Sequence, residues 1–176
     1  MLIYKIICVL LIATTPVFAQ QSHRNHDDIG AHETGQSQFA AIAEIVKILR
    51  DDASTDWENV NIQGLRDHLV DMDNVTTRSS VIVDESGKNV TFTIKGAENV
   101  ARSIQNMVTA HTPMLAATTE WIIVSNLVED GAVMTITAPN NSIRNQILGL
   151  GFYGLMTVGA HHQEHHLLIA KGHSPH

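Results

Sequence analysis

The chain has 176 residues, 44% of them apolar, which is enough for one hydrophobic core and too little for two domains of ordinary size. Its formal net charge is -7 and its sequence holds no cluster of lysine or arginine, so nucleic acid and anionic membrane surfaces are not expected partners. Its 11 histidines equal its lysines and arginines in number and are dispersed along the chain, which is typical of metal binding or pH sensing rather than of an affinity tag.

Residues 1–19 have the pattern of a secretory signal peptide. They contain Lys5, an apolar run over residues 6–13 and a small-residue ending at Ala19, which predicts cleavage after Ala19 and a periplasmic or secreted protein. The apolar run is shorter than the ~20 residues of a spanning helix, so no membrane span is expected after cleavage. Because the single cysteine, Cys8, would leave with this segment, metal ligands would have to be His, Met, Asp or Glu.

The rest of the chain is predicted to form one domain with two short flanking segments. Residues 20–35 are polar and contain almost no large apolar side chain, so we expect this histidine-containing segment to be disordered. Residues 36–171 carry the periodic apolar patterns of a single α+β domain. Residues 172–176 form a short histidine-containing tail.

Two helices are expected at the start of the domain. Apolar residues recur at helical spacing over residues 36–51 and again over residues 62–73. His68 lies at the edge of the apolar stripe of the second helix, one turn before Met72.

Alternating apolar residues then predict two β-hairpins. Each hairpin has a turn in which acidic residues precede a glycine, Gly87 in the first and Gly131 in the second, and glycine supplies the positive φ that such turns require. The four predicted strands are residues 80–83, 90–94, 121–124 and 132–136.

Helical spacing returns between the hairpins and after them. A helix is predicted over residues 97–111, with Pro113 ending or kinking it. A long final helix is predicted from a polar cap within residues 140–142 towards Ala170, with Gly172 as its stop signal. These elements give an α+β fold in which a four-stranded antiparallel sheet, made of two hairpins, packs against four helices.

The order of elements indicates an internal helix–hairpin duplication. His68 and Met72, and later His111 and Met114, each lie near a helix end that is followed by a hairpin with an acidic-glycine turn. The alternative is chance similarity between short apolar segments.

The richest stretch chemically is residues 161–166, which contains four histidines and Glu164. If the final helix is continuous, helical phase places His161 and His165 on its apolar face and places His162 and His166 to the side. His111 falls in the middle of the apolar arc of its own helix by the same argument.

Several inward-facing histidines on different helices favour a metal site, because a buried imidazole costs desolvation free energy unless both nitrogens are paired. Nearby methionines indicate copper, since thioethers favour Cu(I). The leading hypothesis is an exported protein that binds a transition metal, copper first, for storage, delivery or detoxification. The predicted ligands are His161, His165, His111, His68, Met72 and Met114, with His162 and His166 as weaker flanking ligands.

Three alternatives remain open at this stage. The inward histidines could be hydrogen-bonded in a non-enzymatic homodimer or pH-responsive module, with the glycine-rich residues 147–160 of the final helix as its seam. The pattern His161-x-x-Glu164-His165 matches a zinc-peptidase motif, with Glu164 as general base and an upstream third ligand, although we favour a protein without enzymatic activity. Non-covalent haem is the third alternative, because no C-x-x-C-H motif occurs in the sequence.

Overall fold

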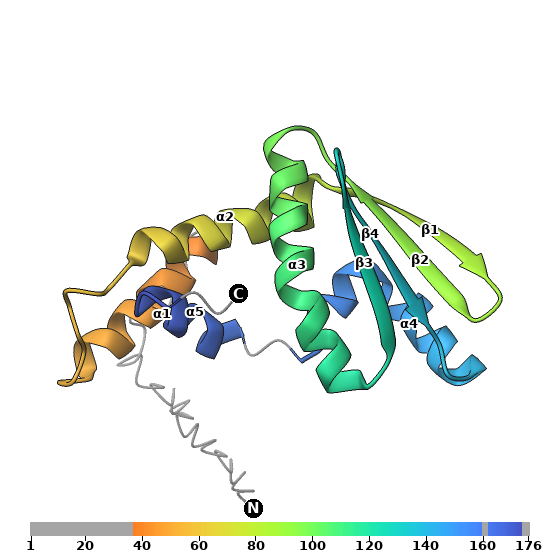
Figure 1. Cartoon of the computed structure of the whole chain (residues 1–176). Helices are drawn as coiled ribbons and strands as arrows, with labels where there is room; N and C mark the ends of the chain where they lie inside the picture. Colours follow the sequence, from red (N-terminus) through yellow and green to blue (C-terminus); the bar gives the residue numbers. More distant parts are fainter. Residues whose placement is uncertain (1–36, 160–161, 174–176) are drawn as a thin grey trace, which may run out of the picture. The chain divides into compact units, whose positions relative to one another are not determined.

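The computed structural model describes residues 37–159 and 162–173 and has the predicted α+β fold (Figure 1). The predicted signal peptide and the polar segment after it lie outside the described residues. The elements in chain order are α1 (Ser37–Asp51), α2 (Ile62–Arg78), β1 (Ser80–Ser86), β2 (Asn89–Lys95), α3 (Asn99–Thr119), β3 (Ile122–Val128), β4 (Gly131–Thr137), α4 (Asn141–Leu155) and α5 (His162–Ala170).

The four strands form one antiparallel sheet in the order β1-β2-β4-β3, so the two predicted hairpins lie side by side and join through β2 and β4. Gly87 adopts φ 59° in the first turn, as predicted. Gly131 begins β4 with φ 151°, and a Cβ there would lie 2.0 Å from the carbonyl oxygen of Ile94 on β2. Glycine at this position therefore allows the two hairpins to approach each other.

The sheet supports the predicted duplication. The sequence offset between β1 and β3 equals the offset between β2 and β4. Phe92 and Met134 are separated by this same offset and pair with each other across the centre of the sheet. The two hairpins are therefore related by an approximate two-fold axis between β2 and β4, and each is preceded by a helix, α2 or α3.

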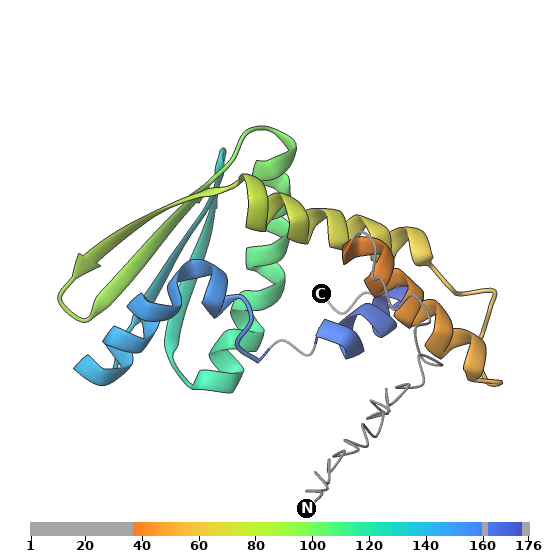
Figure 2. The ribbon, with the colours of Figure 1, turned by 180° about the vertical axis from the view of Figure 1, so that it is seen from behind.

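One face of the sheet is covered by α3 and α4. Successive side chains on a strand point to opposite faces, and Val90, Phe92 and Ile94 of β2 are all fully buried on the same face. They belong to an apolar cluster, here called the sheet core, that includes Ile104 and Val108 of α3. Ile147, Phe152 and Leu155 of α4 complete this core, and Figure 2 shows α4 lying along the sheet.

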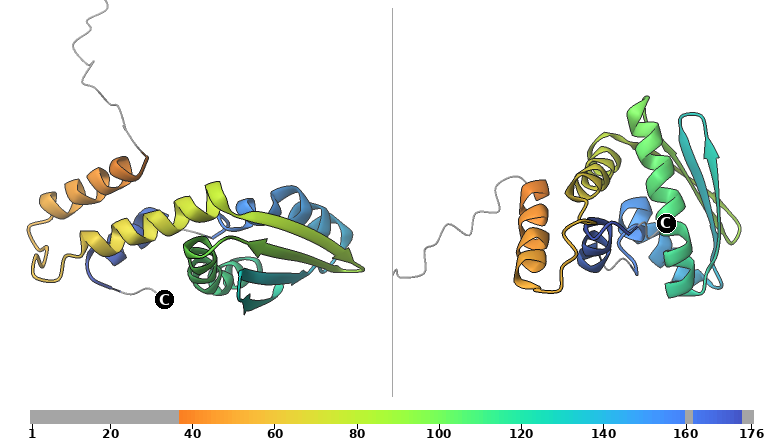
Figure 3. Two further views of the ribbon diagram at one scale, coloured as in Figure 1. Left: turned by 90° about the horizontal axis from the view of Figure 1, so that it is seen from above. Right: turned by 60° about the vertical axis from the view of Figure 1, so that its left-hand side comes forward.

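A second, smaller apolar cluster lies between α1, α2 and α5, grouped together in Figure 3. We call it the helical core, and its buried members are Ile45, Leu49, Leu65, Leu69 and Ala170. Met72 of α2 packs against both cores and so marks the boundary between them.

The predicted final helix is not continuous, and the described residues form five helices where four were predicted. Asn140 caps α4 by accepting a hydrogen bond from the Ile143 amide at 2.9 Å, as predicted. Gly151 interrupts the helical dihedral angles within α4, and Gly159 adopts φ 72° between α4 and α5. A Cβ on Gly159 would lie 2.2 Å from Oγ1 of Thr118 on α3, so glycine allows this linker to pack closely on α3.

Gly172 ends α5 as predicted. It adopts φ 81°, its amide donates to the carbonyl of Ile169, and the His173 amide donates to the carbonyl of Leu168. These are the two hydrogen bonds of a Schellman motif.

Two other predicted helix ends were too early. α2 runs on to Arg78, and α3 continues through Pro113 to Thr119, so Pro113 does not end it. Proline removes one backbone hydrogen bond from a helix, but Leu115, beyond it, is buried in the sheet core, and this packing favours continuation of α3. In the described part of the chain, no helix combines the length and the apolar character needed to cross a bilayer.

Candidate metal centre

Five histidines from three helices form one continuous group, here called the imidazole cluster. Its members are His68 of α2, His111 of α3, and His162, His165 and His166 of α5. The ring centroid of His68 lies 4.8 Å from that of His165 and 5.5 Å from that of His166. His111 lies 6.3 Å from both His162 and His165, and His166 lies 6.2 Å from His162 and 6.4 Å from His165.

The imidazole cluster lies where the sheet core meets the helical core. His111, His165 and His166 are buried, and His68 and His162 are half-buried. Met72, which packs against both apolar cores, lies one turn after His68 on α2. The imidazoles therefore lie beside the residue at which the two apolar cores meet.

His111 occupies the position predicted from the stripe of α3, and its tautomer follows from its hydrogen bond. Its Nδ1 lies 3.0 Å from the carbonyl oxygen of Met107. A carbonyl oxygen only accepts, so Nδ1 carries the proton, and in the neutral ring the lone pair is on Nε2. A backbone carbonyl that orients one imidazole nitrogen in this way is typical of metal-ligating histidines.

His166 is buried, with 5% of its surface exposed, so its predicted position at the side of the helix was wrong. The prediction assumed one continuous helix, but Gly151 has non-helical dihedral angles and α4 ends at Leu155, so α5 begins with a new helical phase. Both ring nitrogens of His166 are buried without a hydrogen-bond partner. A buried polar group left unsatisfied costs about 1–3 kcal/mol, so two such nitrogens on one ring call for an explanation.

Burial also affects the protonation of two cluster members. Desolvation lowers the pKa of His162 below its ordinary value. Desolvation, and after it the charge of His162, lowers the pKa of His166. Both effects favour the neutral imidazole, which is the form that binds a metal.

The spacing of the rings suits shared coordination. An imidazole centroid lies ~3.2 Å from a metal bound to one of its nitrogens, so two rings sharing an ion have centroids ~4.5–6.4 Å apart. The two pairs that include His68, at 4.8 and 5.5 Å, lie near the ~5.2 Å of a tetrahedral site. The other four pairs, at 6.2–6.4 Å, lie near the limit for two rings on opposite sides of one ion. Among the described residues, however, no three His, Cys, Asp or Glu side chains are arranged together as ready metal ligands. Rings that are close but tilted would have to rotate about χ1 and χ2 to aim their nitrogens at one ion.

The remaining predicted ligands are placed as follows. His161 lies outside the described residues. Met72 is half-buried next to the cluster, and it lines a pocket with His166 and another with His162. Met114 is half-buried on α3 and remains a prediction as a ligand.

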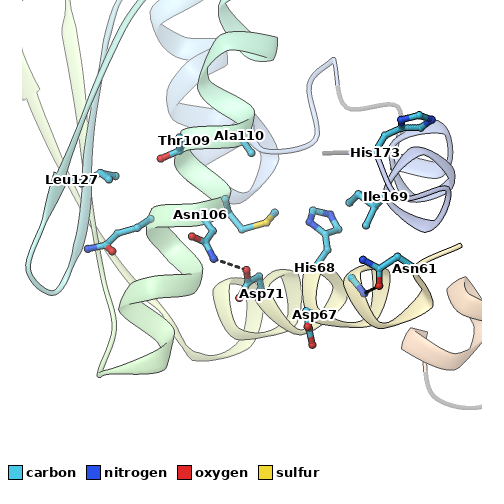
Figure 4. Close-up of a pocket in the computed structure, with 14 residues that line it drawn as sticks. Asn61, Asp67, His68, Asp71, Asn106, Thr109, Ala110, Leu127, Ile169 and His173 are labelled. Carbon is cyan, nitrogen blue, oxygen red and sulfur yellow. Dashed lines mark hydrogen bonds between the residues drawn. The ribbon is translucent and has the colours of Figure 1, made fainter. Parts of the chain in front are cut away.

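A larger pocket of about 520 Å³ opens beside the cluster, between α2, α3 and the end of α5. Figure 4 shows His68 pointing into it, so His68 belongs both to the pocket wall and to the imidazole cluster. Asp71 lines this pocket and is held by hydrogen bonds from Ser103 Oγ at 2.7 Å and Asn106 Nδ2 at 2.9 Å. Sequence periodicity does not predict this polar group, because its hydrogen bonds join two helices at long range.

Sequence reasoning also left Met107 and Met156 out of the predicted ligands. Both line the pocket that contains Met72 and His162. Their signal was present, because each lies about one helical turn before a histidine, in Met107-Val108-Thr109-Ala110-His111 and Met156-Thr157-Val158-Gly159-Ala160-His161.

No family model, curated protein or solved structure matches this chain. Its function must therefore be argued from the site itself.

Proposed function

We propose that this chain is an exported protein that binds a transition metal, copper first, for storage, delivery or detoxification. The observation that carries the proposal is the imidazole cluster, in which five rings from three helices are linked by six neighbouring pairs with centroids 4.8–6.4 Å apart. Export is supported by the signal-like pattern of residues 1–19.

His166 gives the strongest physical reason for a bound cation. Among the described residues, neither buried ring nitrogen has a hydrogen-bond partner, although Gln38, Asp73 and Thr76 line the same pocket as His166, and burying unpaired nitrogens costs free energy. Coordination to a metal satisfies one nitrogen and removes one part of this cost. The lowered pKa of His166 keeps the ring neutral and ready to coordinate.

Copper is favoured over zinc by the side chains around the cluster. Neutral imidazole binds both Zn(II) and Cu(II), but thioethers favour Cu(I). Met72 and Met107 line a pocket together with His162, a member of the imidazole cluster. Zinc is the alternative metal for the same imidazoles.

The enzymatic alternative has less support, because Glu164, its general base, is exposed, whereas His165 and His166 are buried. Haem remains an alternative. The pocket beside His162 and the methionines is only about 80 Å³, but the pocket of about 520 Å³ that His68 lines falls within the ~300–1,000 Å³ of pockets for organic ligands.

The test is a titration of the purified, metal-free chain, made without an affinity tag, with Cu(II), Zn(II) and Ni(II), and with Cu(I) under anaerobic reducing conditions. We expect binding tighter than micromolar, with at least one equivalent that is lost when His165 and His166 are replaced by Gln. The matched control is His173→Gln, which removes an exposed histidine outside the cluster.

Binding weaker than micromolar for every metal would overturn the proposal, as would full retention of binding in the His165→Gln/His166→Gln variant. Circular dichroism of each variant identifies any loss of fold. A metal-independent, concentration-dependent oligomer would favour the homodimer alternative instead. Mass spectrometry of the protein from the expressing cell tests export separately, with a chain beginning at Gln20 as the expected result.

A further inference from the structure

Three methionines from separate elements converge on one pocket. Met72 of α2, Met107 of α3 and Met156, directly after α4, line a pocket of about 80 Å³ together with His162 of α5. These methionines are far apart in sequence, so only the packing of α2, α3 and α4 brings them to one pocket; Met107 also lines the larger pocket beside His68. Met107 is also a buried member of the sheet core, as is Met134, but Met134 lies opposite Phe92 and does not line this pocket.

We infer that this pocket, here called the thioether pocket, is a second metal site, adjoining the imidazole cluster through His162, that takes a soft monovalent cation of the Cu(I) class. Its donors are the sulfurs of Met72, Met107 and Met156 with a ring nitrogen of His162. The inference goes beyond the imidazole cluster, although its biological sense rests on the proposed metal-binding function.

The residues that line the pocket favour a monovalent ion over a divalent one. Its other described lining residues are Val75, Thr76, Tyr153 and Thr157, so none of the described residues in its wall is charged. The cost of moving an ion out of water scales with the square of its charge, so a monovalent ion costs about a quarter of a divalent one here. Thioether sulfurs are soft ligands, which adds a preference for Cu(I) over Zn(II).

The thioether pocket shares a wall with the imidazole cluster. His162 lines the pocket, and its ring centroid lies 6.3 Å from that of His111 and 6.2 Å from that of His166. Met107 joins the two sites as well, because its side chain lines the pocket while its carbonyl oxygen accepts the Nδ1–H of His111. A soft site beside an imidazole site allows an ion to pass between them through a single shared ligand.

The experiment uses Ag(I), a redox-stable probe with the same charge and softness as Cu(I), and follows the methionine methyl groups by NMR in the full chain. We expect Ag(I) to shift the methyl signals of Met72, Met107 and Met156 and to leave that of Met134 unchanged. The signal of Met114 reports in the same spectrum on its predicted role as a ligand. Equal shifts of Met134 and the three pocket methionines, or no shift of the three, would overturn the inference.

A variant with Met72, Met107 and Met156 replaced by Leu tests affinity. Met and Leu have similar volumes, so the fold should tolerate the change, and Met134→Leu is the matched control. We expect the triple variant to bind Ag(I) about 100-fold more weakly or worse, because leucine has no donor atom, while the control binds as the original chain does. Unchanged Ag(I) affinity in the triple variant would overturn the inference.

Zn(II) titration separates this inference from the proposed function. Zn(II) reports on the imidazole cluster, and its affinity should survive the triple Leu substitution but not the His165→Gln/His166→Gln substitution. Zn(II) binding with no Ag(I) response at the methionines overturns the thioether pocket alone. A methionine-specific Ag(I) response with no binding of Zn(II), Cu(II) or Ni(II) overturns the imidazole site and leaves the thioether pocket standing.

Discussion

The sheet core and the imidazole cluster both rest on α3, yet burial has opposite consequences in the two regions. In the sheet core, Phe92 and Ile104 are fully buried among apolar neighbours, so burial stabilises the fold. In the imidazole cluster, His166 is almost as deeply buried, but neither ring nitrogen has a hydrogen-bond partner. There burial costs free energy that a ligand can recover, so the comparison separates residues that maintain the fold from residues available for chemistry.

The largest expected effect is the loss of folding stability when a residue of the sheet core is removed. Phe92→Ala removes a fully buried ring at the centre of the sheet, and such changes cost about 3–5 kcal/mol. Urea unfolding of the metal-free chain measures this loss. The control, Thr93→Ala, lies on the opposite face of the same strand and should lose far less. A loss for Phe92→Ala no larger than the control's would contradict the division between the two regions.

Metal binding at the imidazole cluster should stabilise the folded chain and leave the packing of the sheet core unchanged. Zn(II) at a hundred times its dissociation constant is expected to add about 2.7 kcal/mol, which raises Tm by about 5–10 °C for a domain of this size. Thermal melts before and after EDTA addition measure the shift. The shift should vanish in the His165→Gln/His166→Gln variant and persist in His173→Gln. A Tm that does not respond to any of the metals would speak against the cluster as a site.

Replacing His166 by Leu turns a residue of the imidazole cluster into an apolar core residue. Because the two unsatisfied nitrogens disappear, we expect the metal-free chain to gain about 1–3 kcal/mol of stability while metal-induced stabilisation is lost. His111→Leu is the contrasting variant and should not gain stability, since it removes the hydrogen bond to the Met107 carbonyl. Destabilisation of metal-free His166→Leu in urea unfolding would show that the ring is satisfied in solution.

The smallest effect expected is on the pH dependence of stability. The pKa values of His162 and His166 are lowered in the folded chain, so between those values and the ordinary value near 6.5 the unfolded chain binds more protons. Stability of the metal-free chain should therefore fall as pH drops from 7.5 through this window, by at most about 1.4 kcal/mol per pH unit for each proton. Urea unfolding at several pH values measures the slope, which should be shallower in His166→Leu. Stability that rises as pH falls would reverse the sign and contradict the burial of these rings.

Local sequence patterns were sufficient for most of the fold. The alternation in residues 90–94 predicts a strand with one buried face, and the glycines of the two hairpin turns lie where positive φ is required. Asn140 and Gly172 begin and end helical segments as predicted. The burial of His111 followed from the apolar stripe of its own helix, because a helix without a break keeps its phase.

The sequence by itself thus determined the strands, the turns, the helix caps and the inward face of α3, since each depends on residues a few positions apart. Only the tertiary structure decided that His166 is buried and that Met72, Met107 and Met156 meet at His162. The burial of His166 depends on the interruption between α4 and α5, which gives α5 a helical phase of its own. The meeting of the methionines depends on how α2, α3 and α4 pack, and no local periodicity encodes contacts between residues so distant in sequence.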